Sequence, residues 1–229
     1  MKRCPTCGTE NDEFAVVCVS CKGFIQSKVD TLDLFHTIWG LFESPAETFR
    51  RIGLARVKNY VILLTIGFGI ALAYMLFWNA NFGVAAPNLT TIIGLGLLVG
   101  PVLGLLVVGT LALLVTLVAP KLGGSLKFRN GFAVLAYAAV PVVMTLVVVF
   151  PIELGVFGIY LFDNNPPPIV LNPVAFIVLT GIDGVAACWS LVLSGIGIRV
   201  VAGLSPLWSV AFVVVCAAAI GALFLIPLR

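Results

Sequence analysis

The stretch IIGLGLLVGPVLGLLVVGTLALLVTLV, residues 92–118, contains no Asp, Glu, Lys, Arg or His. A helix needs about 20 apolar residues to cross the hydrocarbon core of a bilayer, and this run is long enough to do so. The whole chain follows the same tendency. Hydrophobic residues make up 61% of it, charged residues only 10%, and its mean hydropathy is +1.16. Because a soluble domain carries about 25% charged residues, the composition predicts a multi-pass membrane protein.

Further apolar runs of spanning length lie on both sides of this stretch. We predict five membrane spans, near residues 60–78, 92–118, 132–150, 174–198 and 207–226. The runs should be helical, since a backbone in hydrocarbon must satisfy its own hydrogen bonds. The predicted fold class is therefore an all-α integral membrane protein, with the membrane domain at 59–229. Residues 151–162 could lengthen the third span, lie in the interface or re-enter the membrane.

The positive charges between the spans alternate from one connection to the next. The first and third connections, 79–91 and 151–173, contain no Lys or Arg. The second and fourth carry Lys121, Lys127, Arg129 and Arg199. Positive residues favour the cytoplasmic side, so we expect the N-terminus to be cytoplasmic and the C-terminus to lie outside. The expected location is the cell membrane.

Two C-x-x-C pairs occupy the N-terminal region: Cys4 with Cys7, and Cys18 with Cys21. In the reducing cytosol paired disulfides are disfavoured. Four thiolates match a closed tetrahedral site for structural zinc, so we predict a zinc ribbon at 1–28 that binds one Zn²⁺ per chain. Redox-active thiols, or an empty site, remain the alternatives. A catalytic zinc is disfavoured, because four sulfur ligands leave no position for water.

An amphipathic segment at 29–58 joins the ribbon to the first span. Apolar residues recur there at helical spacing: Leu32, Phe35, Trp39 and Phe42. This stripe predicts a helix that lies on the membrane surface or docks on the bundle. A second helix should begin at Pro45, with Ser44 as its cap and Glu47 completing a capping box. The basic residues Arg50, Arg51, Arg56 and Lys58 would reach lipid headgroups, as an anchor or as a specific lipid site.

The second span contains glycines at every fourth position: Gly96, Gly100 and Gly104. Such a stripe lets helix backbones approach closely, so we predict that it packs against another helix. Lining a pore is the alternative reading. Pro101 and Pro141 lie inside predicted spans and are expected to kink them.

Asp183 is the only charged residue inside the five predicted spans. An Asp at a helix centre costs about 2.5–3.5 kcal/mol to insert, so its side chain should face the bundle interior and find a partner. We consider the hydroxyls of Thr110, Thr116 and Thr145 as candidates. Asp183 is either an intramembrane functional group for ions or protons, or a structural hydrogen-bonding residue.

Three segments resemble the Yip1 domain family in its bacterial form. They are SPAETFRRI (44–52), KLGGSLKFRNGFAVLAYAAVP (121–141) and CWSLVLSGIGIRVVAGLSPLWSV (188–210). The N-terminus resembles the short zinc ribbons found on bacterial membrane proteins. The family resemblance implies five membrane helices and a cytoplasmic N-terminus. Eukaryotic members are linked to vesicle traffic and to small GTPases of the Rab type, but here a zinc ribbon replaces their soluble N-terminal part.

The sequence favours a non-enzymatic membrane protein, since it contains no recognisable nucleophile–base set. The leading hypothesis is an adaptor or organiser of membrane proteins or lipid, whose ribbon docks a cytosolic or membrane protein partner. The alternative is a small proton- or ion-coupled transporter or channel that uses Asp183. Nucleic acid is disfavoured as a partner, because the basic and acidic residues of the ribbon are balanced. Homo-oligomerisation is left open.

Overall fold

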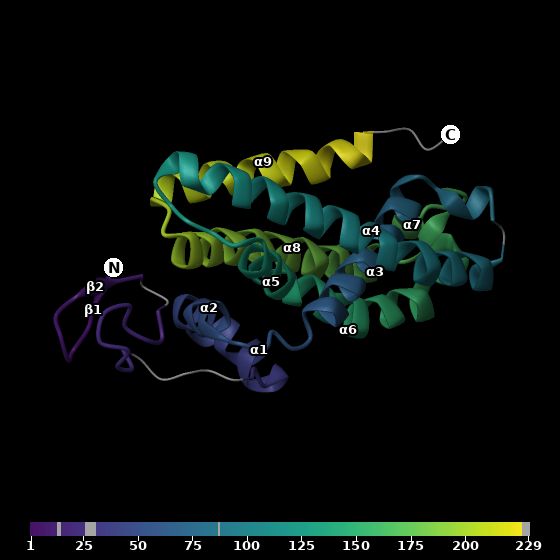
Figure 1. The fold of residues 1–229 in the computed structure, drawn as a ribbon. Helices are drawn as coiled ribbons and strands as arrows, with labels where there is room; N and C mark the ends of the chain where they lie inside the picture. The colour runs from purple at the N-terminus through teal and green to yellow at the C-terminus, as the bar shows by residue number, and fades with distance from the viewer. Residues whose placement is uncertain (13–14, 26–30, 87, 226–229) are drawn as a thin grey trace. The chain divides into compact units, whose positions relative to one another are not determined.

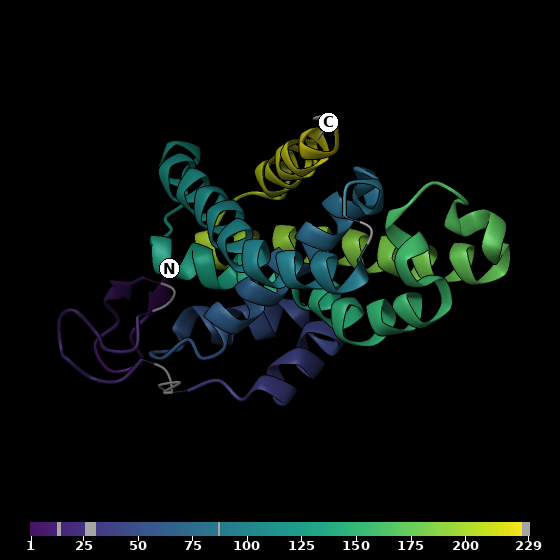
Figure 2. The same ribbon diagram turned by 90° about the vertical axis from the view of Figure 1, so that its right-hand side faces the viewer.

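The computed structural model describes residues 1–229 except 13–14, 26–30, 87 and 226–229. It is mostly helical and divides into two compact units, residues 1–59 and 60–229 (Figures 1 and 2). The N-terminal unit holds the cysteine pairs and two helices. The C-terminal unit holds all the long apolar helices, so we call it the membrane unit. The division falls next to the predicted domain boundary between 58 and 59.

The N-terminal unit begins with two short antiparallel strands, β1 (Lys2–Arg3) and β2 (Glu10–Asn11). Two helices follow, α1 (Leu34–Glu43) and α2 (Pro45–Leu54). Asp33 caps α1 by accepting a hydrogen bond from the backbone N–H of His36 at 2.8 Å. Ser44 precedes α2, but its side chain makes no capping hydrogen bond. The predicted capping box is therefore wrong, and Pro45 at the first helical positions supplies the start signal instead.

Helix α1 presents aromatic side chains outward. Phe35 is 82% exposed and Trp39 71% exposed, whereas Leu41 is fully buried. Helix α2 ends in contacts with Lys58, whose ammonium group donates to the carbonyls of Ile52, Gly53 and Ala55. A cation near these last carbonyls stabilises the helix end.

The described part of the membrane unit contains six α-helices of 11 residues or more and several shorter elements. In chain order these are α3 (Val61–Asn79), η1 (Phe82–Val84), α4 (Leu89–Val118), η2 (Ala119–Leu122), α5 (Phe128–Ala138), α6 (Val140–Phe157), η3 (Gly158–Phe162), α7 (Pro168–Leu171), α8 (Pro173–Ala202) and α9 (Pro206–Leu225). The η elements are turns of 3₁₀ helix.

Among the described residues, four helical segments are long and apolar enough to cross a membrane: Val61–Asn79, Leu89–Leu122, Phe128–Phe162 and Pro173–Ala202. The apolar helix Pro206–Ala218, which is the part of α9 whose residues are fully described, is shorter than a membrane span. The end of the fifth predicted span lies outside the described residues. The chain is thus a membrane protein with four long apolar helical segments, and the fifth span stays a prediction.

The third span differs from its predicted limits. It is divided at Ala139 into α5 and α6, because Pro141 has no N–H to donate to the preceding turn. Helix α6 then continues through Pro151 to Phe157 and is followed by η3. Residues 151–162 therefore continue the helical segment of the third predicted span. Glu153 lies in α6, beyond the predicted limit at 150, so the long apolar segments contain a second acidic residue besides Asp183.

Helices α3 and α4 approach each other through glycine. A Cβ atom built on Gly69 of α3 would lie 2.0 Å from the carbonyl oxygen of Gly100 on α4. On α4 itself, a Cβ on Gly104 would lie 2.2 Å from the carbonyl oxygen of Thr65. At Gly96 the ring of Tyr74 fills the space of the missing side chain. The glycine stripe thus lies in the contact between α4 and α3.

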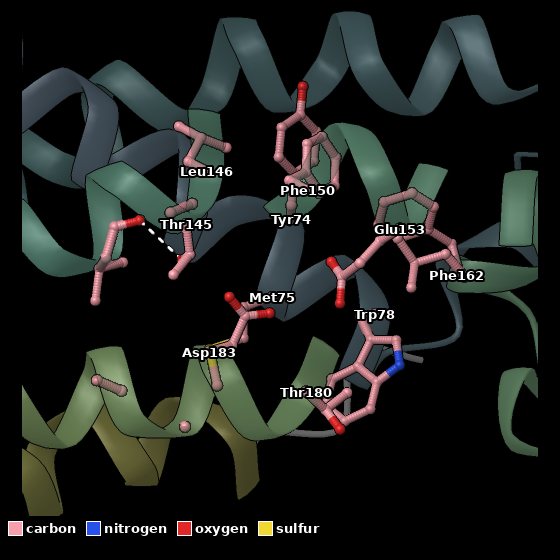
Figure 3. Close-up of a pocket in the computed structure, with 15 residues that line it drawn as sticks. Tyr74, Met75, Trp78, Thr145, Leu146, Phe150, Glu153, Phe162, Thr180 and Asp183 are labelled. Atoms are coloured by element: carbon pink, nitrogen blue, oxygen red, sulfur yellow. Dashed lines mark hydrogen bonds between the residues drawn. The ribbon is translucent and has the colours of Figure 1, made fainter. Parts of the chain in front are cut away.

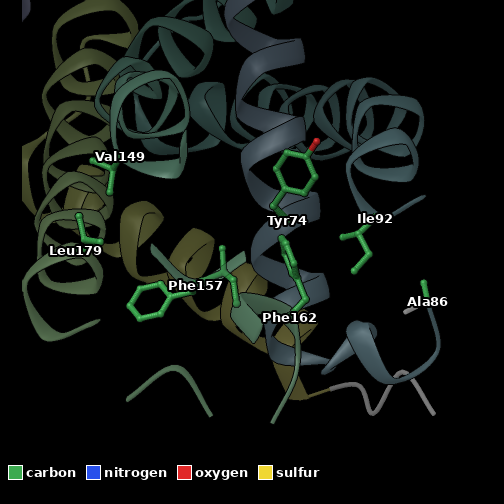
Figure 4. Close-up of a cluster of buried hydrophobic side chains, with 8 residues drawn as sticks. Tyr74, Ala86, Ile92, Val149, Phe157, Phe162 and Leu179 are labelled. Atoms are coloured by element: carbon green, nitrogen blue, oxygen red, sulfur yellow. The ribbon is translucent and has the colours of Figure 1, made fainter. Parts of the chain in front are cut away.

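An aromatic cluster holds α3 and α6 together near η3 (Figure 4). Tyr74 of α3 stacks on Phe150 of α6, with ring centroids 4.4 Å apart. Its hydroxyl donates to the carbonyl of Ile93 on α4 at 2.9 Å, so its polar tip is satisfied within the apolar cluster. These contacts fix the positions of α3 and α6, which both line the cavity described below, relative to each other and to α4.

The connections meet in pairs at the two ends of the membrane unit. The backbone N–H of Ser125 donates to the carbonyl of Ala202 at 2.9 Å, which joins the second and fourth connections. Elsewhere, η1 packs on η3: a Cβ on Gly83 would lie 2.8 Å from the carbonyl oxygen of Phe162. The two connections rich in Lys and Arg therefore share one end of the bundle.

Candidate metal centre and intramembrane carboxyl pair

The two cysteine pairs form two turns of similar geometry. In the first, Cys4 donates its N–H to the carbonyl of Thr9, and Gly8 donates to the carbonyl of Cys4. In the second, Cys18 donates to Gly23 and Lys22 donates to Cys18 in the same pattern. Gly8 has a φ of +73°, which favours glycine, but the matching left-handed residue of the second turn is Lys22, not Gly23.

These turns bring the four sulfur atoms together. The Sγ atoms of Cys4, Cys7, Cys18 and Cys21 all lie within 4.8 Å of one another. Cys4 and Cys21 are 3.6 Å apart at sulfur, and Cys7 and Cys18 are 3.5 Å apart. A zinc ion with tetrahedral Zn–S bonds of about 2.3 Å places its sulfurs about 3.8 Å apart. The donor set and its spacing therefore fit a tetrahedral metal ion.

Asn11 supports the sulfur cluster from one side. Its side-chain oxygen accepts from the N–H of Val19 at 2.9 Å, and its amide donates to the carbonyl of Thr9 at 2.7 Å. The same amide approaches the sulfur of Cys18 at 3.6 Å. Such contacts orient ligands and stabilise negative charge on sulfur. Hydrogen bonds with Thr9 also lower the pKa of Cys7 to about 6, which favours the thiolate that binds metal.

A second site lies inside the membrane unit, where α3 and α8 both pack against α6. A cavity of about 340 Å³ is lined there by residues of these helices and of η3 (Figure 3). Its walls are mostly apolar and aromatic, including Trp78 and Phe150. Two carboxyl groups, Glu153 from α6 and Asp183 from α8, also line it. Figure 3 shows both side chains extending toward the space between the helices.

The two carboxyl groups come from facing helices and line one cavity. Glu153 is only 7% exposed. Thr145, one of the three candidate partners of Asp183, lines the same cavity, but its hydroxyl donates to the carbonyl of Val142 in its own helix at 3.1 Å. Thr116 likewise donates to the carbonyl of Ala112 in its own helix at 2.7 Å. None of the described residues that line the cavity is Lys, Arg or His.

Glu153 was not singled out from the sequence, although a periodic signal was present. Thr145, Leu146, Phe150 and Glu153 lie 3, 4, 8 and 11 positions after Val142, and all five line the cavity. Residues with this spacing share one face of a helix. Extending the third span past Pro151 would have placed both a hydroxyl and a carboxyl on that face.

Comparison with known families gives one match. The Yip1 domain model matches residues 39–228, which covers most of the chain and includes all the apolar helices. Searches among curated proteins and among solved structures gave no match. The family resemblance read from three sequence segments is thereby confirmed, and this chain belongs to the Yip1 domain family.

Proposed function

We propose that the chain is a non-enzymatic membrane adaptor, in which a zinc ribbon docks a protein partner and the membrane helices associate with membrane proteins or lipid. The observation that carries the proposal is the closed cluster of four sulfur atoms within 4.8 Å of one another. Four sulfurs complete the tetrahedral coordination of zinc and leave no position for a reacting water, so the metal has a structural role. The cluster stabilises a small module whose surface is free to bind a partner.

The ribbon presents an apolar surface suited to such a partner. Val17 and Phe24 pair across a backbone bridge and are 41% and 72% exposed. Val19, at the start of the second cysteine turn, is 67% exposed. Apolar residues that gather on the surface of a small module are typical of protein interaction sites. We call Val17, Val19 and Phe24 the ribbon patch and assign it a protein partner.

The proposed arrangement places the ribbon in the cytoplasm. Lys121, Lys127, Arg129 and Arg199 belong to connections that meet at one end of the membrane unit. The positive-inside rule assigns that end to the cytoplasm, and with five spans it places the C-terminus outside. The exposed Phe35 and Trp39 of α1 would then lie in the headgroup region of the inner surface.

The test is a crosslinking pull-down from native membranes with full-length protein. Phe24→Ser should lose a specific partner, because it removes the largest side chain of the ribbon patch. Arg3→Gln changes an exposed polar residue of the same module and should retain that partner. A chain without residues 1–28 should behave like Phe24→Ser. If all four chains capture the same proteins, the ribbon does not dock a partner.

The carboxyl pair supports a second candidate function, a small proton- or ion-coupled transporter that uses Asp183. Ionisable groups inside a membrane commonly mark proton or ion pathways, and here Glu153 and Asp183 share one cavity. Asp183→Asn keeps size and polarity but removes the titratable group. If transport is the function, this variant should be stable in detergent and inactive in a complementation or flux assay. A stable and fully active variant would assign Asp183 a structural role.

A further inference from the structure

The cavity between α3, α6 and α8 combines three features that are seldom found together inside a membrane domain. It has a volume of about 340 Å³, it is walled by aromatic and aliphatic side chains, and it contains two carboxyl groups. An apolar pocket with a few convergent polar groups is the usual form of a small-molecule site. The cavity is therefore better suited to a bound molecule than to packing alone.

The carboxyl groups specify the charge of that molecule. Glu153 is 7% exposed, and the carboxyl group of Asp183 lines the same cavity. Negative charge in such surroundings is costly unless a positive charge or a proton compensates for it. No described lining residue is Lys, Arg or His, so the lining itself supplies no cation and a bound cation would be stabilised there.

The walls specify the rest of the molecule. Trp78 of α3 lines the same cavity as the two carboxyl groups (Figure 3), and an indole face attracts an ammonium group. Met75 and Trp78 are 48% and 38% exposed, so the cavity reaches the outer surface of the membrane unit beside α3. Val61–Asn79 is long and apolar enough to span a membrane, so this surface would face lipid and give an apolar molecule a lateral route of entry.

We propose that this cavity binds a lipophilic ammonium ion, with the ammonium group at Glu153 and Asp183 and an alkyl or aryl body along the apolar walls. Its volume suits a ligand of roughly ten to fifteen non-hydrogen atoms. A phospholipid headgroup is disfavoured, because the carboxyl groups repel its phosphate and no lining cation would bind it. Binding of the ammonium ion in the cavity requires neither partner docking by the ribbon nor transport.

The test measures binding of radiolabelled decyltrimethylammonium to full-length protein in phosphatidylcholine nanodiscs, with empty nanodiscs subtracted. Its charge is fixed, and its size fits the cavity. Saturable binding at one site per chain is expected. Unlabelled decylammonium should displace the probe, whereas decanol should not. Absence of saturable binding to the wild-type chain would overturn the proposal. Displacement by decylphosphocholine as effective as that by decylammonium would overturn the choice of an ammonium ion without a phosphate group.

Two kinds of variant separate charge from shape. Glu153→Gln with Asp183→Asn should weaken binding at least about tenfold, a difference of about 1.4 kcal/mol. Gly184→Leu keeps both carboxyl groups but fills the cavity, because Gly184 lines it and a Cβ there meets nothing within 4 Å. It should abolish binding. Gly181→Leu is the matched control: it lies on the same helix with equal room, outside the cavity lining, and should bind normally.

Thermal stability in detergent is measured for each variant. If the double carboxyl variant does not fold, the proposal is tested by comparing the binding affinities of Gly184→Leu and Gly181→Leu. Equal affinity in Gly184→Leu and Gly181→Leu would show that the cavity is not the binding site. Unchanged affinity in a folded double carboxyl variant would show that the carboxyl groups do not bind the cation.

Discussion

Replacing Gly100 by Ala should destabilise the membrane unit far more than the same change at Gly109 of the same helix. A Cβ on Gly100 would lie 2.5 Å from the Cα and 2.8 Å from the backbone nitrogen of Ile70 on α3. Ordinary carbon contacts are about 3.5 Å, so α3 and α4 have to separate by roughly 1 Å. Backbone atoms cannot rotate away, and the separation loosens the neighbouring contacts of Gly69 and Gly104. Overpacking of this kind costs about 1–3 kcal/mol.

Gly109 provides the control, because a Cβ there meets nothing within 4 Å. Gly109→Ala should be neutral or stabilise by up to about 1 kcal/mol through helix propensity. The measurement is the free energy of reversible unfolding in mixed micelles for both variants and the wild type. We expect Gly100→Ala to lie about 2 kcal/mol below Gly109→Ala. Equal stabilities would refute the close α3–α4 contact.

Three further outcomes are expected. Purified protein should contain about one equivalent of zinc, and Cys18→Ser should lose most of it while the membrane unit stays folded, which tryptophan fluorescence and metal analysis can check. On a cysteine-free background, an impermeant thiol reagent applied to intact cells should label a cysteine at Ala85 or Asn165 and leave one at Ser125 unlabelled; the reverse pattern would invert the orientation. With Trp39 as the sole tryptophan, its fluorescence should be quenched by lipids brominated near the headgroups, whereas quenching by aqueous iodide alone would place α1 in solvent.

Features that are local in the chain were accessible from the sequence. The C-x-x-C spacing brings two thiols into one turn, so Cys4 and Cys7 point to a metal site before any fold is known. Hydropathy located most of the apolar helices for a similar reason, since each residue in hydrocarbon contributes independently. The glycines at 96, 100 and 104 also indicated a helix contact, although the sequence did not say which helix would meet them.

Features that depend on several segments were not accessible in the same way. The sequence left three placements open for residues 151–162, and α6 continues past Pro151 and includes Glu153. Membrane helices tolerate proline because neighbouring groups satisfy the freed carbonyl. The cavity needs three helices at fixed positions, and single-helix patterns cannot specify that. Likewise, the sequence predicted that Lys58 reaches lipid headgroups, but its ammonium group donates to the carbonyls at the end of α2.

The contact between Gly96 and Tyr74 has a consequence for the evolution of this family. A Cβ at position 96 would lie 2.1 Å from a ring carbon of Tyr74, so the two positions share a single volume. Neither can change alone without a clash or a void. Across related chains the two sites should therefore vary together, with a larger residue at 96 accompanied by a smaller one at 74. The hydroxyl of Tyr74 adds a condition, because its loss leaves the carbonyl of Ile93 without this donor. Chains that substitute both positions should thus carry a new hydroxyl or amide nearby in α3 or α4. In a family alignment, position 96, position 74 and this third position should vary together.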